Sequence, residues 1–134
     1  VTACLKEYRD QPVHEHIWTQ GQRLMDGIAE IGKTHGVPIH CTGLAPMSQP
    51  GFHYEDAALN GDVWSLFLQE TAKRGVLIRR GGLLFITYSH SAADIDETLV
   101  AINGALAVIA DAVKGGKVKD MLQVREVEEG FRRF

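Results

Sequence analysis

The chain has 134 residues, of which 45% are hydrophobic and 23% are charged, and its net charge is −3. This length fits one ordinary domain whose core needs neither a disulfide nor a metal. The acidic balance argues against nucleic acid as a partner, and no apolar run approaches the roughly 18 residues of a membrane span.

The first third of the sequence predicts two consecutive helices. Residues 1–10 contain good helix formers but no N-cap precedes them, so we expect 1–12 to be the end of an interdomain helix that is truncated at its start. Pro12 suits the first turn of the next helix. From Val13 the apolar residues recur on one helical face, and we expect this helix to end between Gly32 and Gly36.

Two short strands separated by a loop are predicted next. Apolar and polar residues alternate over 37–42, which indicates a half-buried strand. The segment 43–51 (GLAPMSQPG) contains two prolines and two glycines and predicts a loop. Residues 51–55 then predict a second strand, with Phe52 and Tyr54 on one face.

A turn and a helix follow. Asn60-Gly61 is a turn signal, and Asp62 is the expected N-cap of a helix that ends at Gly75. Beyond it, 76–78 and 83–88 predict two strands joined by a tight connection.

The final predicted helix has the strongest signals in the sequence. Ser91 and Asp94 have the spacing of a capping box. From Ile95 to Val113 the apolar residues alternate steps of four and three, and Gly115-Gly116 is the expected end of this helix.

These elements predict an α+β fold, with a small antiparallel or mixed sheet of three or four strands and helices packed on one face. We expect the small α/β domain to span 13–116 and a C-terminal tail to span 117–134, which forms either a helix or an extended arm. The other face of the sheet must meet water or another body of protein.

Few residues offer chemistry. His14 and His16 point to different sides of a helix, and the remaining histidines have no spaced set of metal ligands around them, so we expect no metal site. His90 lies in a Ser-His-Ser run without a carboxylate to orient it, which does not make a catalytic triad. Arg79-Arg80 is more informative, because two adjacent guanidinium groups can bind a carboxylate or phosphate; ion-paired surface arginines are the alternative.

Cys4 and Cys41 lack any motif spacing, which indicates free thiols in a reducing, cytoplasmic compartment.

Five motifs in order resemble one known family. They are the pattern H-x4-G-x2-L-x2-G over 16–27, the segment GVP with a following glycine over 36–43, FL and KRGV over 67–76, SHS with DIDxTL over 89–99, and GFRRF at 130–134. Together the chain resembles the C-terminal small domain of class III pyridoxal-phosphate-dependent aminotransferases, in the branch near glutamate-1-semialdehyde aminomutase.

The resemblance implies a larger enzyme of fold type I that works as a homodimer. Its pyridoxal 5'-phosphate is held by a lysine of the large domain, upstream of Val1, and none of the lysines here matches that motif. The resemblance therefore implies that no residue of this chain is catalytic or binds the cofactor, and that the 134 residues alone are inactive. The small domain lines the active site and helps to select a small amino acid or amine substrate.

Two departures from the family bear on the reaction. Thr87 stands where many members have an arginine that binds the α-carboxylate, and no acidic residue occurs from Gly75 to Tyr88, where aminomutases carry one. We therefore expect a related aminotransferase in which Arg79 or Arg80 meets a substrate carboxylate. The alternatives are the aminomutase reaction proper and a stand-alone α+β domain for ligand binding or interaction.

Overall fold

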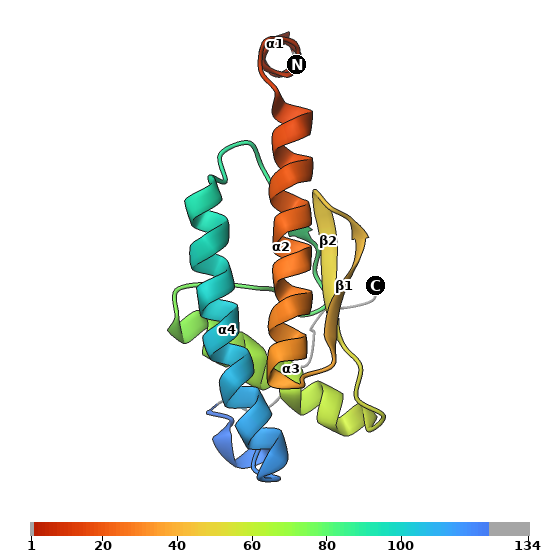
Figure 1. Cartoon of the computed structure of the whole chain (residues 1–134), viewed down its shortest axis with the longest axis vertical. Coiled ribbons are helices and arrows are strands. Elements are labelled where there is room, and N and C mark those ends of the chain that lie inside the picture. Colours follow the sequence, from red (N-terminus) through yellow and green to blue (C-terminus); the bar gives the residue numbers. More distant parts are fainter. Residues whose placement is uncertain (1, 124–134) are drawn as a thin grey trace, which may run out of the picture.

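A computed structural model describes residues 2–123 and confirms the α+β fold (Figure 1). A three-stranded antiparallel sheet of order β1-β2-β3 packs against helices. In chain order the elements are α1 (Thr2–Asp10), α2 (Val13–His35), β1 (Ile39–Leu44), β2 (Met47–Phe52), α3 (Ala57–Lys73), β3 (Leu84–Phe85), α4 (Ala92–Lys114) and a single 3₁₀ turn, η1 (Lys119–Met121).

The two long helices, α2 and α4, lie side by side, and the β1–β2 hairpin packs on the opposite side of α2 (Figure 1). The helix α2 ends as predicted, because Gly36 has a φ of 66° and its N–H donates to the carbonyls of Gly32 and Lys33. Helix α1 is also formed where predicted, but it has no buried residue.

The hairpin corrects the prediction of a loop over 43–51. The strands β1 and β2 pair from Ile39–Phe52 to Leu44–Met47, and only two residues connect them. Proline misled the prediction: Pro50 lies in the part of β2 that β3 does not reach, where a missing backbone N–H is tolerated. Tyr54, predicted to share a strand with Phe52, lies beyond the end of β2.

The sheet has one buried and one exposed face, as a helix layer on one side requires. On the buried face, Phe52 packs edge-to-face against Trp64 and Phe67 of α3, with ring centroids 5.3 Å from each. The core continues through α2, α3 and α4 by fully buried side chains, which include Ile28, Leu66, Ile102, Leu106 and Ile109.

Helix α3 starts earlier than predicted. Asp56 is its N-cap, and the carboxylate accepts hydrogen bonds from the backbone N–H groups of Ala58 and Leu59. Asn60 forms no turn, because its side-chain amide bonds both the N–H and the carbonyl of Tyr54, at 2.9 and 2.7 Å. Gly61 and Asp62 therefore lie inside the helix.

The strand predicted over 76–78 is absent, and the second one shrinks to the two residues of β3. Leu77 is 88% exposed, so the apolar run that suggested a strand has no sheet neighbour to bury it. The strand β3 pairs only with Met47 and Ser48 of β2.

The predictions for α4 are confirmed at both ends. The Ser91 hydroxyl accepts from the N–H of Asp94, whose carboxylate accepts from the N–H of Ser91, which is a complete capping box. Gly115 caps the C-terminus, and Gly116 follows with a φ of 64°. The predicted tail is described only as far as Gln123; its remainder lies outside the described residues, and the proposed domain limits stay predictions.

Candidate functional site

The two arginines singled out by the sequence lie in a tight turn rather than between two paired strands. The N–H of Gly82 donates to the carbonyl of Arg79 over 3.1 Å, and Gly81 has a φ of 63°, which is the pattern of a type II turn. The Gln49 side chain, which projects from β2, donates to the carbonyl of Gly81 over 3.0 Å. Arg79 is exposed and Arg80 is half-buried, so the turn carries its guanidinium groups at the edge of the sheet.

A second polar group gathers where β3 leads into α4. His90 Nδ1 accepts from the Thr87 N–H over 3.0 Å, which leaves Nε2 as the ring nitrogen that carries hydrogen in the neutral ring. His16 of α2 donates from Nε2 to the carbonyl of His90 over 2.7 Å, and its ring packs edge-on against Tyr88. His16 thus anchors this corner to α2, although its position alone suggested a solvated helix residue.

This corner offers uncharged polar groups and no triad. The Ser91 hydroxyl donates to the Asp94 carboxylate over 2.7 Å, so both side chains are occupied in capping α4. Hydrogen bonds from Ser91 hold the pKa of Asp94 below its ordinary value. Thr87, at the position where the resemblance implied an arginine in many members, presents a hydroxyl beside His90.

The other histidines do not assemble a metal site. His14 packs against Tyr8, and His35 hydrogen-bonds Asn103 over 2.8 Å. His40 and His53 stack with ring centroids 4.0 Å apart, an arrangement that the sequence did not suggest. Among residues 2–123, no group of three potential ligands is placed to hold a metal ion.

The surroundings of the lysines decide whether one of them could hold pyridoxal phosphate as a Schiff base. A Schiff-base lysine must reach a bound pyridoxal phosphate inside an enclosed site. All six lysines of the sequence lie within the described part of the chain, and all are exposed. The hydrogen bond that Lys33 donates to the Glu30 carboxylate raises the pKa of Lys33, which favours its charged form and not the neutral amine that a Schiff base requires. These lysines do not fit the role of the cofactor lysine.

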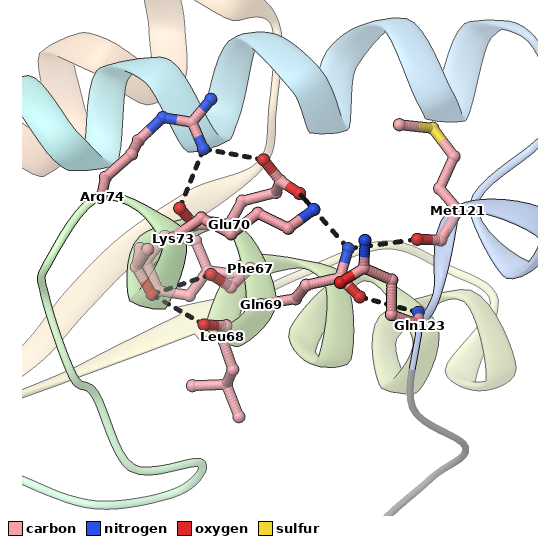
Figure 2. A network of polar contacts seen from close by, with 9 residues as sticks. Phe67, Leu68, Gln69, Glu70, Lys73, Arg74, Met121 and Gln123 are labelled. Carbon is pink, nitrogen blue, oxygen red and sulfur yellow. Dashed lines mark hydrogen bonds and ion pairs between the residues drawn. The ribbon is translucent and has the colours of Figure 1, made fainter.

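An ionic network around the buried Glu70 side chain, at the end of α3, was not predicted (Figure 2). The Glu70 carboxylate is bound by Lys73 Nζ over 2.8 Å and by Arg74 Nη1 over 2.7 Å, and the Glu70 side chain is only 8% exposed. Burial would raise the pKa of Glu70, but hydrogen bonds from Lys73, Arg74 and Gln69 outweigh it and lower the pKa to about 2. The i+3 and i+4 spacing was the available signal in the sequence.

The network also ties the chain after α4 to α3. Gln69 donates to the carbonyl of Met121 over 3.1 Å and accepts from the N–H of Gln123 over 2.8 Å (Figure 2). A Cβ added at Gly104 of α4 would lie 2.5 Å from Arg74 Nε, so Arg74 covers α4 closely. Because the Glu70 carboxylate is paired with Lys73 and Arg74, we interpret this network as structural.

Comparison with known proteins points to one class of enzyme. The sequence is 27% identical over 108 residues to glutamate-1-semialdehyde 2,1-aminomutase of Syntrophobacter fumaroxidans, an alignment that covers 74% of this chain and 25% of that enzyme. No protein-family model matches the chain. In the part of the chain that the structure describes, no helix is both long and apolar enough to cross a membrane.

Solved structures share the fold. The PLP form of the FumI protein of Sphingopyxis sp. MTA144 aligns with a TM-score of 0.74 and 24% identity, over 82% of this chain and 26% of that protein. An omega-transaminase from Sphaerobacter thermophilus aligns with a TM-score of 0.63 and 19% identity, over 69% of this chain and 23% of that one. The resemblance to a class III aminotransferase-like domain is confirmed, and the chain spans about a quarter of the length of these relatives.

Proposed function

We propose that this chain is the C-terminal domain of a PLP-dependent aminotransferase, which transfers an amino group between an amino acid or amine and an oxo acid or aldehyde. The observation that carries the proposal is that 82% of the chain superposes on one quarter of a PLP protein with a TM-score of 0.74. The independent sequence similarity to an aminomutase supports it.

In this proposal the chemistry takes place on residues outside the chain. Pyridoxal phosphate supplies an electron sink for the amino transfer when it is bound. The exposed lysines described above support a cofactor site in a larger domain of the same polypeptide. We further propose that the complete protein is a cytoplasmic homodimer, which sedimentation of that protein tests.

The role proposed for this domain is to bind the substrate. The Arg79–Gly82 turn is closed by the hydrogen bond between its two ends, and Gln49 binds the carbonyl of Gly81, so the turn carries two arginines on a fixed backbone. A guanidinium matches a carboxylate with two parallel hydrogen bonds. Because Thr87 provides no cation at the family's usual position, we propose that Arg79 or Arg80 supplies it.

The experiment is amino transfer by the complete protein with two sets of donors, one with a carboxylate and one without. Arg79→Ala or Arg80→Ala is expected to raise KM about tenfold or more for carboxylate donors, since hydrogen bonds between charged groups contribute about 1.5–3 kcal/mol. Amines without a carboxylate should be unaffected. Arg9→Ala removes an exposed arginine that pairs with Asp10 in α1, and serves as the matched control. Unchanged KM values in both turn variants would exclude them from the site.

The aminomutase reaction proper is the second candidate, because the curated relative named above is an aminomutase. It differs in that the amino group moves within one molecule. Formation of product from glutamate 1-semialdehyde without any separate amino acceptor would favour it, whereas a strict requirement for an acceptor favours the transaminase. The absence of an acidic residue over 75–88 is the reason to rank it second.

A further inference from the structure

One peptide unit of the Arg79–Gly82 turn is held from both sides. The carbonyl of Gly81 and the N–H of Gly82 belong to the same planar trans peptide, so they point in opposite directions. The N–H of Gly82 donates to the carbonyl of Arg79 over 3.1 Å, within the turn. The carbonyl of Gly81 accepts from the Gln49 side chain over 3.0 Å. Rotation of this peptide would break both hydrogen bonds, so together they fix its orientation.

Gln49 can hold this peptide because it projects from a paired strand. Its backbone lies in β2, in register with Thr42 of β1, and side chains on strands are placed more precisely than those on loops. The pairing of β3 with β2 covers Met47 and Ser48, so at Gln49 a side chain takes over as the link to the neighbouring segment. Because a carbonyl can only accept, this link requires a hydrogen-bond donor on the side chain of residue 49.

The Arg79 side chain lies across the turn, next to Gly82. A Cβ placed on Gly82 would lie 3.1 Å from Arg79 Cβ and 3.3 Å from Arg79 Cγ and Cδ, distances at which one of the two must give way. The missing side chain of Gly82 therefore leaves the room that the stem of Arg79 occupies. Arg79 is exposed, whereas Arg80 is half-buried. The turn thus supports the stem of the more exposed of its two arginines.

We infer that Gln49 and Gly82 are positioning residues for Arg79, and that Arg79 is the arginine that binds the substrate carboxylate; this inference rests on the proposed function. A side chain that is held near its bound conformation loses less freedom when it binds, which strengthens binding. Arginine has much rotamer freedom to lose. Gln49 binds the backbone of the turn, so its effect on substrate binding passes through Arg79.

Kinetics of the complete protein test the role of Gln49, with donors that carry a carboxylate and amines that do not. Gln49→Met keeps the length of the side chain and removes the donor. It should raise KM for carboxylate donors about threefold to tenfold, as the loss of one hydrogen bond does, and leave kcat and the KM of the amines unchanged. Gln49→Lys retains an N–H donor and should restore most of the affinity. Gln22→Met is the matched control, because Gln22 donates to Asp26 on the exposed side of α2 over 2.8 Å, and it should change neither KM.

A double-mutant cycle tells the two arginines apart. Because Gln49 acts through Arg79, Gln49→Met should have no further effect on KM in Arg79→Ala, but its full effect in Arg80→Ala. Gly82→Ala should also raise KM for carboxylate donors, since the new Cβ displaces the stem of Arg79. Hydrogen exchange of the Gly82 N–H, followed by mass spectrometry, should become about fivefold faster in Gln49→Met and not in Gln49→Lys. Unchanged circular dichroism shows that the variants fold.

The outcomes separate this inference from the proposed function. Unchanged KM values in both Arg79→Ala and Arg80→Ala refute the substrate role proposed for this domain, and the inference with it. If an arginine variant raises KM for carboxylate donors but Gln49→Met does not, the role of Gln49 is overturned and the proposed function stands. The same holds if Gln49→Met acts equally with and without Arg79. A carboxylate-specific rise that Gln49→Lys reverses and Arg79→Ala abolishes supports the inference.

Discussion

Neutralising Glu70 should lower the stability of the domain in a pH-dependent way. The pKa of Glu70 is about 2 in the folded protein, against an ordinary 4.5. A difference of about 2.5 between the two corresponds to about 3 kcal/mol of stabilisation of the charged form. Lys73 is 43% exposed and Arg74 is 32% exposed, so water screens their attraction and we expect about 1–2 kcal/mol.

The sign of the pH dependence follows from the direction of the pKa change. Because folding lowers the pKa, the carboxylate contributes its stabilisation fully above the unfolded value of about 4.5. That contribution is lost as the pH falls from about 4.5 toward 2. The free energies of unfolding of the wild type and Glu70→Gln should therefore differ by about 1–2 kcal/mol at pH 7 and converge as the pH falls through this range.

Urea unfolding at several pH values measures this difference. Glu30→Gln is the matched control, because Glu30 also pairs with a lysine three residues later, Lys33, over 2.6 Å. In that pair, unlike the Glu70 pair, both side chains are exposed. It should change stability little at any pH. If Glu70→Gln behaves like Glu30→Gln, or if its deficit persists unchanged at pH 3, the reasoning from burial and pairing is refuted.

Three further predictions concern packing, capping and thiol chemistry. Gly21→Ala should lower the free energy of unfolding by about 2 kcal/mol or more, because the new Cβ would overlap the backbone carbonyl of Ala45 in the hairpin turn. Gly27→Ala should lower it less, because its Cβ meets only the end of the Leu99 side chain; urea unfolding measures both. Ser91→Ala should cost about 1 kcal/mol in thermal unfolding through loss of the capping box, and Ser91→Thr should restore most of it. Burial raises the pKa of Cys41 to about 11, although a hydrogen bond with a serine hydroxyl lowers it by a smaller amount. Iodoacetamide at pH 7 should therefore modify the exposed Cys4 first and Cys41 only on unfolding. Equal rates of modification, measured by mass spectrometry, would contradict this.

The sequence predicted elements whose signals are local and strong. The capping box at Ser91 and the left-handed Gly36 each depend on a few neighbouring residues, and both are confirmed. The predicted start of α3 was wrong because two acceptable N-cap residues, Asp56 and Asp62, lie six residues apart. Asp56 is the N-cap because Asn60 uses its amide to hold Tyr54, a pairing across a bend that has no periodic signature.

In the candidate site, too, local features were predictable and contacts between distant residues were not. The tight turn at Gly81 was readable from its glycines, but the strands expected around it were not formed. Strand formation depends on a neighbour: β3 extends only as far as it can pair with Met47 and Ser48, and residues 76–78 have no such partner. For the same reason the exposed apolar row of Leu44, Met47 and Phe85 could not be predicted from the sequence, since its members come from three strands and meet only through their register.

The register also separates the residues of β2 that stabilise the domain from those that the domain exposes. Ser48, Pro50 and Phe52 are buried toward the helices, whereas Met47 and Gln49 alternate with them on the exposed face. A one-residue slip of β2 would exchange the two sets, burying Met47 and exposing Phe52. The contacts of Phe52 with Trp64 and Phe67 oppose that slip, so the aromatic cluster that builds the core also fixes which residues face outward. Substitutions on the buried face should therefore lower the free energy of unfolding, whereas polar substitutions of the exposed Leu44, Met47 or Phe85 should change it little.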